Sequence, residues 1–404
     1  MCQDANRVRS LSPFAMTLIL GLLSGIGPFS TDLYLASMPD IGASLQATPA
    51  QVQLTISFYL VGFALGQIVY GPVSDRYGRK PVLLAAVTIY CIASIACVFA
   101  TSIEMLIVAR LLQALGGCGA IVLPRAIVRD LYSGARAGRE MAVIAMVMGL
   151  APLLAPILGG VLQTWFGWRS SFIVMAVVGI EAVALVWWYL PETLKNPLGD
   201  MVTPASILQS YRFVLREPSF VAHLLLTALA YAGLFAWISG AAFVLQDIYH
   251  FTALGFAVAF TLASAFFLAG TSTAAKLVMR YGVGTIIGAG SVLLAVGGLS
   301  MVAVLALRLD HPFALVGAAA IYIAGLGLML PQAIAAAINP FPERAGAASS
   351  LIGFVQQLAA SLCGVLVGHQ LGVSAWPIAI PMALGGCATL ACWSLTRGVR
   401  APRH

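Results

Sequence analysis

The chain has 404 residues, of which 61% are hydrophobic and only 9% are charged, whereas soluble domains contain about 25% charged residues. This composition excludes a soluble globular fold, a disordered chain and a small disulfide-stapled secreted domain. A bilayer-spanning helix needs about 20 mostly apolar residues, so the apolar content is enough for about twelve such helices. The composition therefore predicts a polytopic membrane protein.

Hydrophobic runs follow one another along the chain and are separated by short charged or Pro/Gly-rich stretches. They are expected near residues 13–36, 51–71, 81–100, 105–126, 140–162, 169–190, 218–244, 252–275, 282–305, 313–336, 346–369 and 375–396. None shows the period-two alternation of an outer-membrane strand. The first run lacks a cleavage site after a short apolar core, so we expect it to remain as the first helix.

The longest polar stretch divides these runs six and six. The predicted fold class is all-α, with twelve transmembrane helices in two pseudo-symmetric six-helix bundles, 1–190 and 218–404. The linker, 191–217, contains apolar residues at helical spacing from Pro204 to Glu217, which predicts a surface helix between the bundles.

The distribution of basic residues predicts the orientation. With the N-terminus inside, every Lys and Arg except Arg110, Arg169 and Arg308 falls on the inner side. Both termini are therefore expected in the cytoplasm. The net charge of +7 follows from this topology, so it does not indicate a nucleic-acid partner.

Polar residues mark the first two runs. Asp32 and Tyr34 lie near the outer end of the first run. A carboxyl group partly withdrawn from water can exchange a proton, so Asp32 is a candidate for proton coupling; the alternative is an acid in the headgroup layer close to Pro39. Tyr34 and Tyr59 are candidate substrate contacts, although Tyr59 lies on a stripe of small residues that also suits helix packing.

The most informative string stands between the second and third runs. Its key residues are Gly71, Asp75, Arg76, Gly78, Arg79 and Lys80. The glycines allow a tight turn, and the charged residues can pair with a neighbouring helix end; the alternative is a generic basic hairpin. A weaker copy, Met279 to Gly282, follows the eighth run and supports two homologous halves.

Arg110 lies within the fourth run, with Gln113 on the same helix face. A charged side chain is costly in hydrocarbon unless it faces a cavity or a counter-charge. We expect Arg110 to act in proton relay or gating and Gln113 to contact substrate, with a purely structural pair as the alternative.

The fifth and sixth runs hold a Pro/Gly motif and a lone acid. The motif consists of Pro152, Pro156, Gly159 and Gly160. Proline removes a helical hydrogen bond and glycine allows close approach, which suits a helix that bends or seals a central path, or an ordinary packing seam. Glu181 lies among apolar residues and must be neutral or paired, so it is a second candidate for proton coupling, unless its helix is only an outer support.

The second half offers three candidate substrate contacts. Tyr231 and Phe235 share one face of the seventh run and could form aromatic walls around a drug-like molecule. Gln357 lies on a small-residue stripe of the eleventh run. For all three residues, helix packing is the alternative.

Three of these motifs resemble known signatures. The string from Gly71 to Lys80 is similar to the loop signature of the major facilitator superfamily, Gly-x-x-x-Asp-Arg/Lys-x-Gly-Arg/Lys-Arg/Lys. The fifth run resembles the antiporter signature Gly-x-x-x-Gly-Pro-x-x-Gly-Gly, with Ala151 and Ala155 replacing two glycines. The segment Ser30–Pro39 resembles Ser-x-Asp-Met-Tyr-Leu-Pro-Ala-Leu-Pro of the Bcr/CflA drug-resistance subfamily.

The resemblance implies a proton-coupled antiporter that exports drug-like molecules of the bicyclomycin and chloramphenicol type. Its partners would be the small-molecule substrate, protons and the lipid bilayer of a bacterial inner membrane, and it would act as a monomer by alternating access. The alternative is a narrow-specificity metabolite exporter or a proton symporter of the same fold. The sequence has no ATP-binding loop, catalytic cluster or metal-ligand spacing, so we expect neither an enzyme nor a cofactor.

Overall fold

The structure is a computed structural model that describes residues 12–194, 204–309, 311–341, 344–371, 374–396 and 398. These residues form helices and contain no strand. The helices are α1 (Pro13–Asp32), η1 (Leu35–Ser37), α2 (Met38–Ser44), α3 (Pro49–Tyr77), α4 (Arg79–Val98), α5 (Ile103–Leu131), α6 (Gly134–Phe166), α7 (Arg169–Tyr189), α8 (Pro204–Leu215), α9 (Pro218–Phe243), η2 (Val244–Ile248), α10 (Ala253–Tyr281), α11 (Val283–Ala306), α12 (Pro312–Ile338), α13 (Ala345–Gln370) and α14 (Trp376–Leu395). Twelve helical segments of the described chain are long and apolar enough to cross a bilayer, which confirms the predicted fold class.

Local signals in the sequence explain where several helices begin and end. Thr48 and Gln51 form a capping box at the start of α3, which satisfies amide groups that the helix itself leaves free. Gly78 separates α3 from α4 with φ +99°, and Gly282 separates α10 from α11 with φ +78°. Both backbones adopt the left-handed region that favours glycine, and these are the two positions that the sequence repeat aligns.

The first predicted run, 13–36, does not form one helix. Regular α-helix ends at Asp32, and the chain continues through η1 into the short helix α2. Pro39 stands in the first turn of α2, where its missing amide hydrogen costs no helical hydrogen bond. The break places Asp32 at the last turn of α1. It also buries Tyr34 completely.

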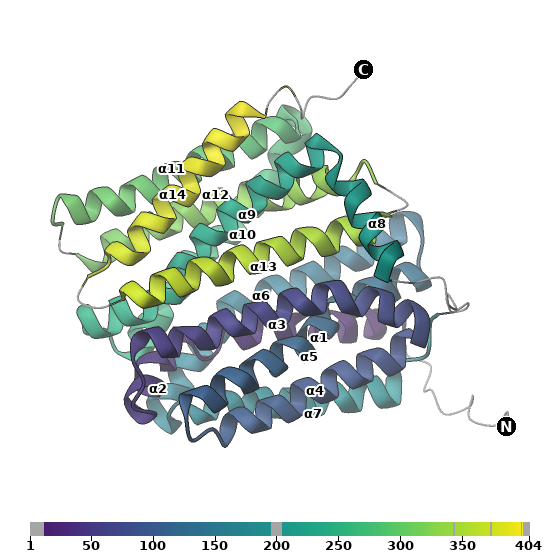
Figure 1. The fold of residues 1–404 in the computed structure, drawn as a ribbon, viewed down its shortest axis with the longest axis horizontal. Coiled ribbons are helices and arrows are strands. Elements are labelled where there is room, and N and C mark those ends of the chain that lie inside the picture. The colour runs from purple at the N-terminus through teal and green to yellow at the C-terminus, as the bar shows by residue number, and fades with distance from the viewer. Residues whose placement is uncertain are drawn as a thin grey trace.

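The spanning helices form two groups that meet along two seams. Helices α1 and α3–α7 pack mainly with one another, as do α9–α14 (Figure 1). Between the groups, α3 packs along α13 and α6 packs along α10. Along the α3–α13 seam, a Cβ added at Gly353 would lie 2.9 Å from Gln67, and one added at Gly364 would lie 2.4 Å from Gln53. The small residues of α13 therefore allow close contact between the halves.

Four hydrogen bonds between described residues of the two halves lie toward the end that carries α2, and another joins Thr261 to the carbonyl of Leu153 at 3.5 Å. Ser57 and Ser361 each donate to the other's backbone carbonyl, at 3.1 and 3.0 Å. Gln53 donates to Ser239 at 3.1 Å, and Gln246 donates to the carbonyl of Ala36 at 3.1 Å. The halves are thus tied together at this end.

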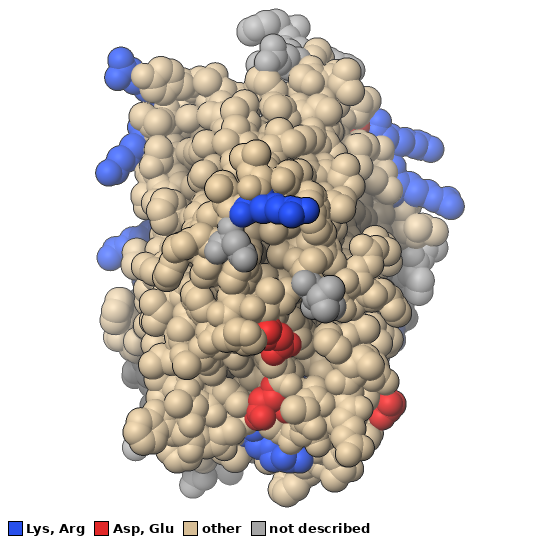
Figure 2. Space-filling model, turned by 90° about the vertical axis from the view of Figure 1, so that its left-hand side faces the viewer, with Lys and Arg blue, Asp and Glu red and all other residues tan. Residues whose placement is uncertain are grey.

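Charge is distributed unevenly between the two ends of the molecule. Figure 2 views the end that carries α2, where charged side chains are few and scattered. Basic residues gather at the opposite end, where α3 meets α4, α5 meets α6 and α10 meets α11. This asymmetry suits a cytoplasmic location for the basic end, which stays a prediction.

Candidate transport site

Arg110 is completely buried inside the first half, as the eighth of the 29 residues of α5. Its Nη1 donates to Oε1 of Gln113 at 2.5 Å, and its Nη2 donates to the carbonyl of Ser30 on α1 at 3.2 Å. Gln113 is oriented in turn, because its amide nitrogen donates to Ser94 at 2.7 Å and contacts the sulfur of Met175 at 3.4 Å. Gln113 therefore lies inside the first half, where it holds Arg110 in position.

Aromatic rings surround the guanidinium group of Arg110. Its central carbon lies 4.3 Å from the ring centre of Tyr34, 4.2 Å from that of Tyr59 and 5.8 Å from that of Phe172. No carboxylate among the described residues forms an ion pair with Arg110, and its Nε has no hydrogen-bond partner. A cation at the centre of a spanning helix costs about 2.5–3.5 kcal/mol on insertion scales. Around Arg110, ring faces and carbonyl oxygens stabilise the positive charge.

Further hydroxyl groups support this arginine cage, which we define as Tyr34, Tyr59, Phe172 and Gln113 around Arg110. The hydroxyl of Tyr34 lies 3.0 Å from that of Thr55, and the hydroxyl of Ser30 lies 2.7 Å from that of Tyr90. Sequence reasoning missed Tyr90 and Phe172. The hydroxyl group in the middle of an apolar run was an available signal for Tyr90, whereas nothing in the sequence distinguishes Phe172 from other apolar residues.

Asp32 lies on the same helix as Ser30, close to the arginine cage, but does not join it. Its side chain is 7% exposed, and it forms no hydrogen bond or ion pair with the described residues. It stands at the C-terminal end of α1, where the helix dipole disfavours negative charge. The carboxyl group of Asp32 is thus largely shielded from solvent. It lies where α1 ends, just before the segment that contacts the second half.

Two glycines of the Pro/Gly motif lie beside this break. A Cβ added at Gly159 would lie only 1.8 Å from the carbonyl oxygen of Leu33, and one added at Gly160 would lie 2.7 Å from the Cβ of Ala257 on α10. Gly159 thus lets α6 approach the residue after Asp32, while Gly160 lets α6 contact the second half. Pro152 and Pro156 both lie inside α6.

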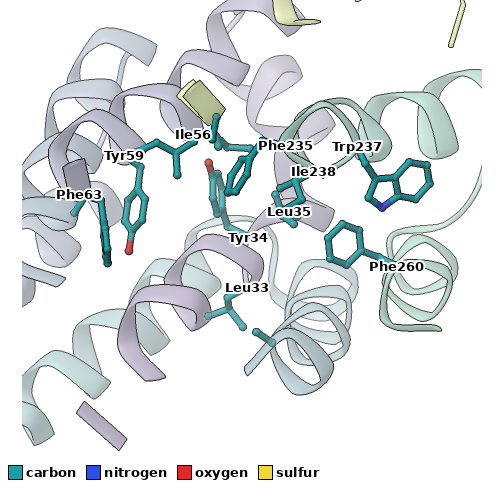
Figure 3. Close-up of a cluster of buried hydrophobic side chains, with 14 of the residues drawn as sticks. Leu33, Tyr34, Leu35, Ile56, Tyr59, Phe63, Phe235, Trp237, Ile238 and Phe260 are labelled. Atoms are coloured by element: carbon teal, nitrogen blue, oxygen red, sulfur yellow. The ribbon is translucent and has the colours of Figure 1, made fainter. Parts of the chain in front are cut away.

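The second half contributes aromatic and amide side chains. Phe235 is 3% exposed, and its ring centre lies 5.0 Å from that of Tyr231 on the same helix. Figure 3 shows the Phe235 ring beside Tyr34 in a buried cluster that contains residues of both halves. On α13, Oε1 of Gln357 is buried without a hydrogen-bond partner, which leaves an acceptor free for water or a ligand.

Glu181 lies apart from these residues. It is exposed on α7 and lines a groove of about 310 Å³ between α1, α6 and α7. Apolar residues form most of that groove, including Leu22, Leu154 and Leu185. The structure therefore does not bring Glu181 together with Asp32 or Arg110.

The loop motif between α3 and α4 forms an ion-pair cluster at the basic end. Arg79 contacts Asp75 at 2.5 Å through Nη1 and Asp130 at 2.9 Å through Nε. Its Nη1 also donates to Ser74 at 2.6 Å. Arg76 instead lies 5.3 Å from the ring centre of Tyr77. The cluster joins α3, α4 and the end of α5 within the first half.

Glu192 completes this cluster, a role that the sequence did not predict. Its carboxylate accepts hydrogen bonds from the backbone amides of Arg79 at 3.0 Å and Lys80 at 3.1 Å, at the start of α4. Lys80 reaches the other way and donates to the carbonyl of Trp187, at 3.0 Å, near the end of α7. An acid at a helix start and a cation at a helix end are both favourable. Only Gly78 forms the expected turn. Gly71 was expected to take part in it as well but lies in the last turns of α3, with open space around its backbone.

Comparison with known proteins defines the family. The sequence matches the Major Facilitator Superfamily over residues 18–396. It is 32% identical to the uncharacterized MFS-type transporter YdgK of Bacillus subtilis, over 95% of this chain and 96% of that protein. It is 29% identical to the bicyclomycin resistance protein homolog of Haemophilus influenzae, over 94% of both chains. The xylose transporter XylE from E. coli, in a partially occluded inward open conformation, matches the structure with a TM-score of 0.74 at 14% identity, over 95% of this chain and 96% of that one.

The family match and the twelve-span architecture define a multi-pass membrane transporter that handles small molecules, and not an enzyme. The chain belongs to the Major Facilitator Superfamily.

Proposed function

We propose that this transporter exports drug-like small molecules across the bacterial inner membrane in exchange for protons, as a monomer that works by alternating access. The observation that carries the proposal is the arrangement of Asp32 and Arg110. The Asp32 carboxyl group stands at the end of α1. Two residues earlier, the carbonyl of Ser30 binds Arg110. Neither Asp32 nor Arg110 forms an ion pair with another described residue. Ionisable groups buried in a membrane are typical of proton pathways.

The chemistry follows from which group is charged in each state. Protonation of Asp32 from the outside would leave Arg110 as the charged group of the site and favour release of substrate. Loss of that proton to the cytoplasm would restore the carboxylate and its affinity for substrate. Tyr34, Tyr231, Phe235 and Gln357 would supply the aromatic and amide contacts. Similarity to the bicyclomycin resistance protein homolog supports drug-like substrates.

A susceptibility experiment tests export and coupling together. A pump-deficient bacterial host would express the wild type, Asp32→Asn or Asp40→Asn at equal abundance and be exposed to bicyclomycin and chloramphenicol. Asp40 is the matched control, because it is an exposed acid at the same end of the molecule that binds Gln163. We expect resistance with the wild type and Asp40→Asn, and its loss with Asp32→Asn.

Inside-out vesicles with an imposed pH gradient separate the two parts of the proposal. Drug added to wild-type vesicles should accelerate collapse of the gradient, and drug added to Asp32→Asn vesicles should not. Resistance that survives Asp32→Asn would overturn coupling through this residue. A wild type that protects against neither drug would overturn export of this class and favour a metabolite as the substrate.

A further inference from the structure

A basic cavity lies outside the spanning helices, between α8 and the start of α13. Its volume is about 350 Å³. It is lined by Leu208, Gln209, Arg212, Phe213, Arg216 and Arg344. Neither the transport site nor the loop cluster includes any of these residues. Helix α8 lies between the spanning helices α7 and α9 in the chain. In Figure 1, it crosses the ends of the spanning helices.

One face of α8 is fixed to the protein and another is left uncovered. Val214 is fully buried and packs in a cluster with Phe220 and Phe341. Phe213 is 51% exposed and Leu208 is 50% exposed. This helix lies at the level where the spanning helices end, and it exposes apolar residues there. Such an arrangement is typical of a helix that lies in the membrane interface.

The three arginines of the cavity come from two elements. Arg212 lies on α8, and Arg216 follows its last residue, one helical turn further along. Arg344 directly precedes α13. Arg344 is held in place, because its guanidinium carbon lies 4.1 Å from the ring centre of Phe213. None of the three forms an ion pair with a carboxylate in the described part of the chain. Three like charges around one cavity attract an anion.

We infer that this cavity binds the phosphate group of an anionic phospholipid, with Arg212, Arg216 and Arg344 as donors and acyl chains over Leu208 and Phe213. The arginine charges select an anion, and clusters of basic residues beside a membrane bind acidic headgroups. The exposed apolar side chains that line the cavity, Leu208 and Phe213, favour a lipid over a soluble phosphate, because only a lipid would cover them. A bound lipid would connect α8 to α13, the helix that packs on α3 across the seam.

Binding can be measured on the purified full-length protein in a neutral detergent, independently of transport. Phosphatidylglycerol, phosphatidylcholine or inorganic phosphate would be added, with thermal unfolding and native mass spectrometry as readouts. We expect phosphatidylglycerol alone to raise the unfolding temperature and to remain bound in the mass spectrum. Arg212→Gln/Arg216→Gln should weaken this binding at least about tenfold.

The matched control is Lys276→Gln/Arg280→Gln, which removes two exposed basic residues near the end of α10 and should retain the lipid. Arg216→Gln alone provides a milder variant, because this side chain is exposed, and its lipid adduct should also weaken. The proposal is overturned if the double variant binds phosphatidylglycerol as the wild type does. It is equally overturned if inorganic phosphate stabilises the protein as much as the lipid, which would assign the cavity to a soluble anion.

Discussion

Arg110 shows how a cation can be held in a membrane protein without an acidic partner in contact. Its two terminal nitrogens bind oxygens of Gln113 and Ser30, and the flat guanidinium group lies near the rings of Tyr34 and Tyr59. These contacts use the planar, forked shape of arginine, which lysine does not have. The cage thus depends on the shape of the group as well as on its charge.

Arg110→Lys should therefore abolish transport and lower stability, although it keeps the charge. The lysine ammonium cannot satisfy both oxygens while it contacts both rings, so we expect a loss of about 2 kcal/mol of stabilisation. Transport in vesicles and thermal unfolding of the purified protein measure the two effects.

Arg129→Lys is the control, because Arg129 is exposed at the end of the same helix. It should behave as the wild type. Wild-type transport by Arg110→Lys would show that charge alone is sufficient at this position.

At the scale of single helices, α6 depends on a close approach at Gly159. Its backbone packs against the carbonyl of Leu33, directly after Asp32. Gly159→Ala should displace α6 or the break after α1, since the new methyl carbon would lie 1.8 Å from that oxygen. We expect either strongly reduced transport by a folded protein or a fall in the unfolding temperature. Vesicle transport measures the first effect, thermal unfolding measures the second, and the size-exclusion profile shows whether the protein is folded.

Gly138→Ala tests the same substitution on the same helix where nothing lies within 4 Å of the new carbon. Alanine also has a higher helix propensity than glycine, so this variant should be at least as stable as the wild type. Equal behaviour of the two variants would contradict a specific role of Gly159.

The start of α4 depends on a residue far along the chain, Glu192. Glu192→Ala removes the acceptor for the amides of Arg79 and Lys80, so stability should fall by about 1 kcal/mol. Thermal unfolding in detergent measures this loss. Glu217→Ala should change little, because Glu217 makes no side-chain bond to the helix that it precedes; a comparable loss there would refute the capping role of Glu192.

The sequence predicted the helices better than the directions in which their side chains point. Length and apolar content were enough to predict twelve spans. The helical spacing of apolar residues from Pro204 to Glu217 predicted the surface helix, which the structure shows at Pro204–Leu215. Hydrocarbon and helix interfaces are both apolar in a membrane, so hydropathy does not reveal how a helix is rotated. Hydropathy therefore could not predict that Gln113, expected at the substrate, lies inside the first half. The partners of Arg110 could not be predicted for the same reason.

For the whole molecule, alternating access requires the two halves to separate where they now touch. Ser57 and Ser361 bind each other's backbone across the α3–α13 seam. In a background with the native cysteines replaced, Ser57→Cys/Ser361→Cys should cross-link and stop transport, and a reductant should restore it. Vesicle uptake before and after reduction measures the effect.

The single variants Ser57→Cys and Ser361→Cys control for the substitutions themselves and should transport in either redox state. Full transport by a completely cross-linked double variant would contradict the opening of this seam during the cycle. Failure to cross-link under oxidising conditions would contradict the close contact itself.

In the proton exchange proposed above, the arginine cage would also make the transporter sensitive to the membrane potential. Arg110 carries its charge buried inside a membrane-spanning segment, with no ion-pair partner among the described residues. Whenever Asp32 holds a proton, any movement of the first half carries uncompensated positive charge through the membrane field. That field is worth about 2.3 kcal/mol per elementary charge per 100 mV. Voltage would therefore act on the moving protein itself, so that collapsing the membrane potential at a fixed pH difference slows its turnover.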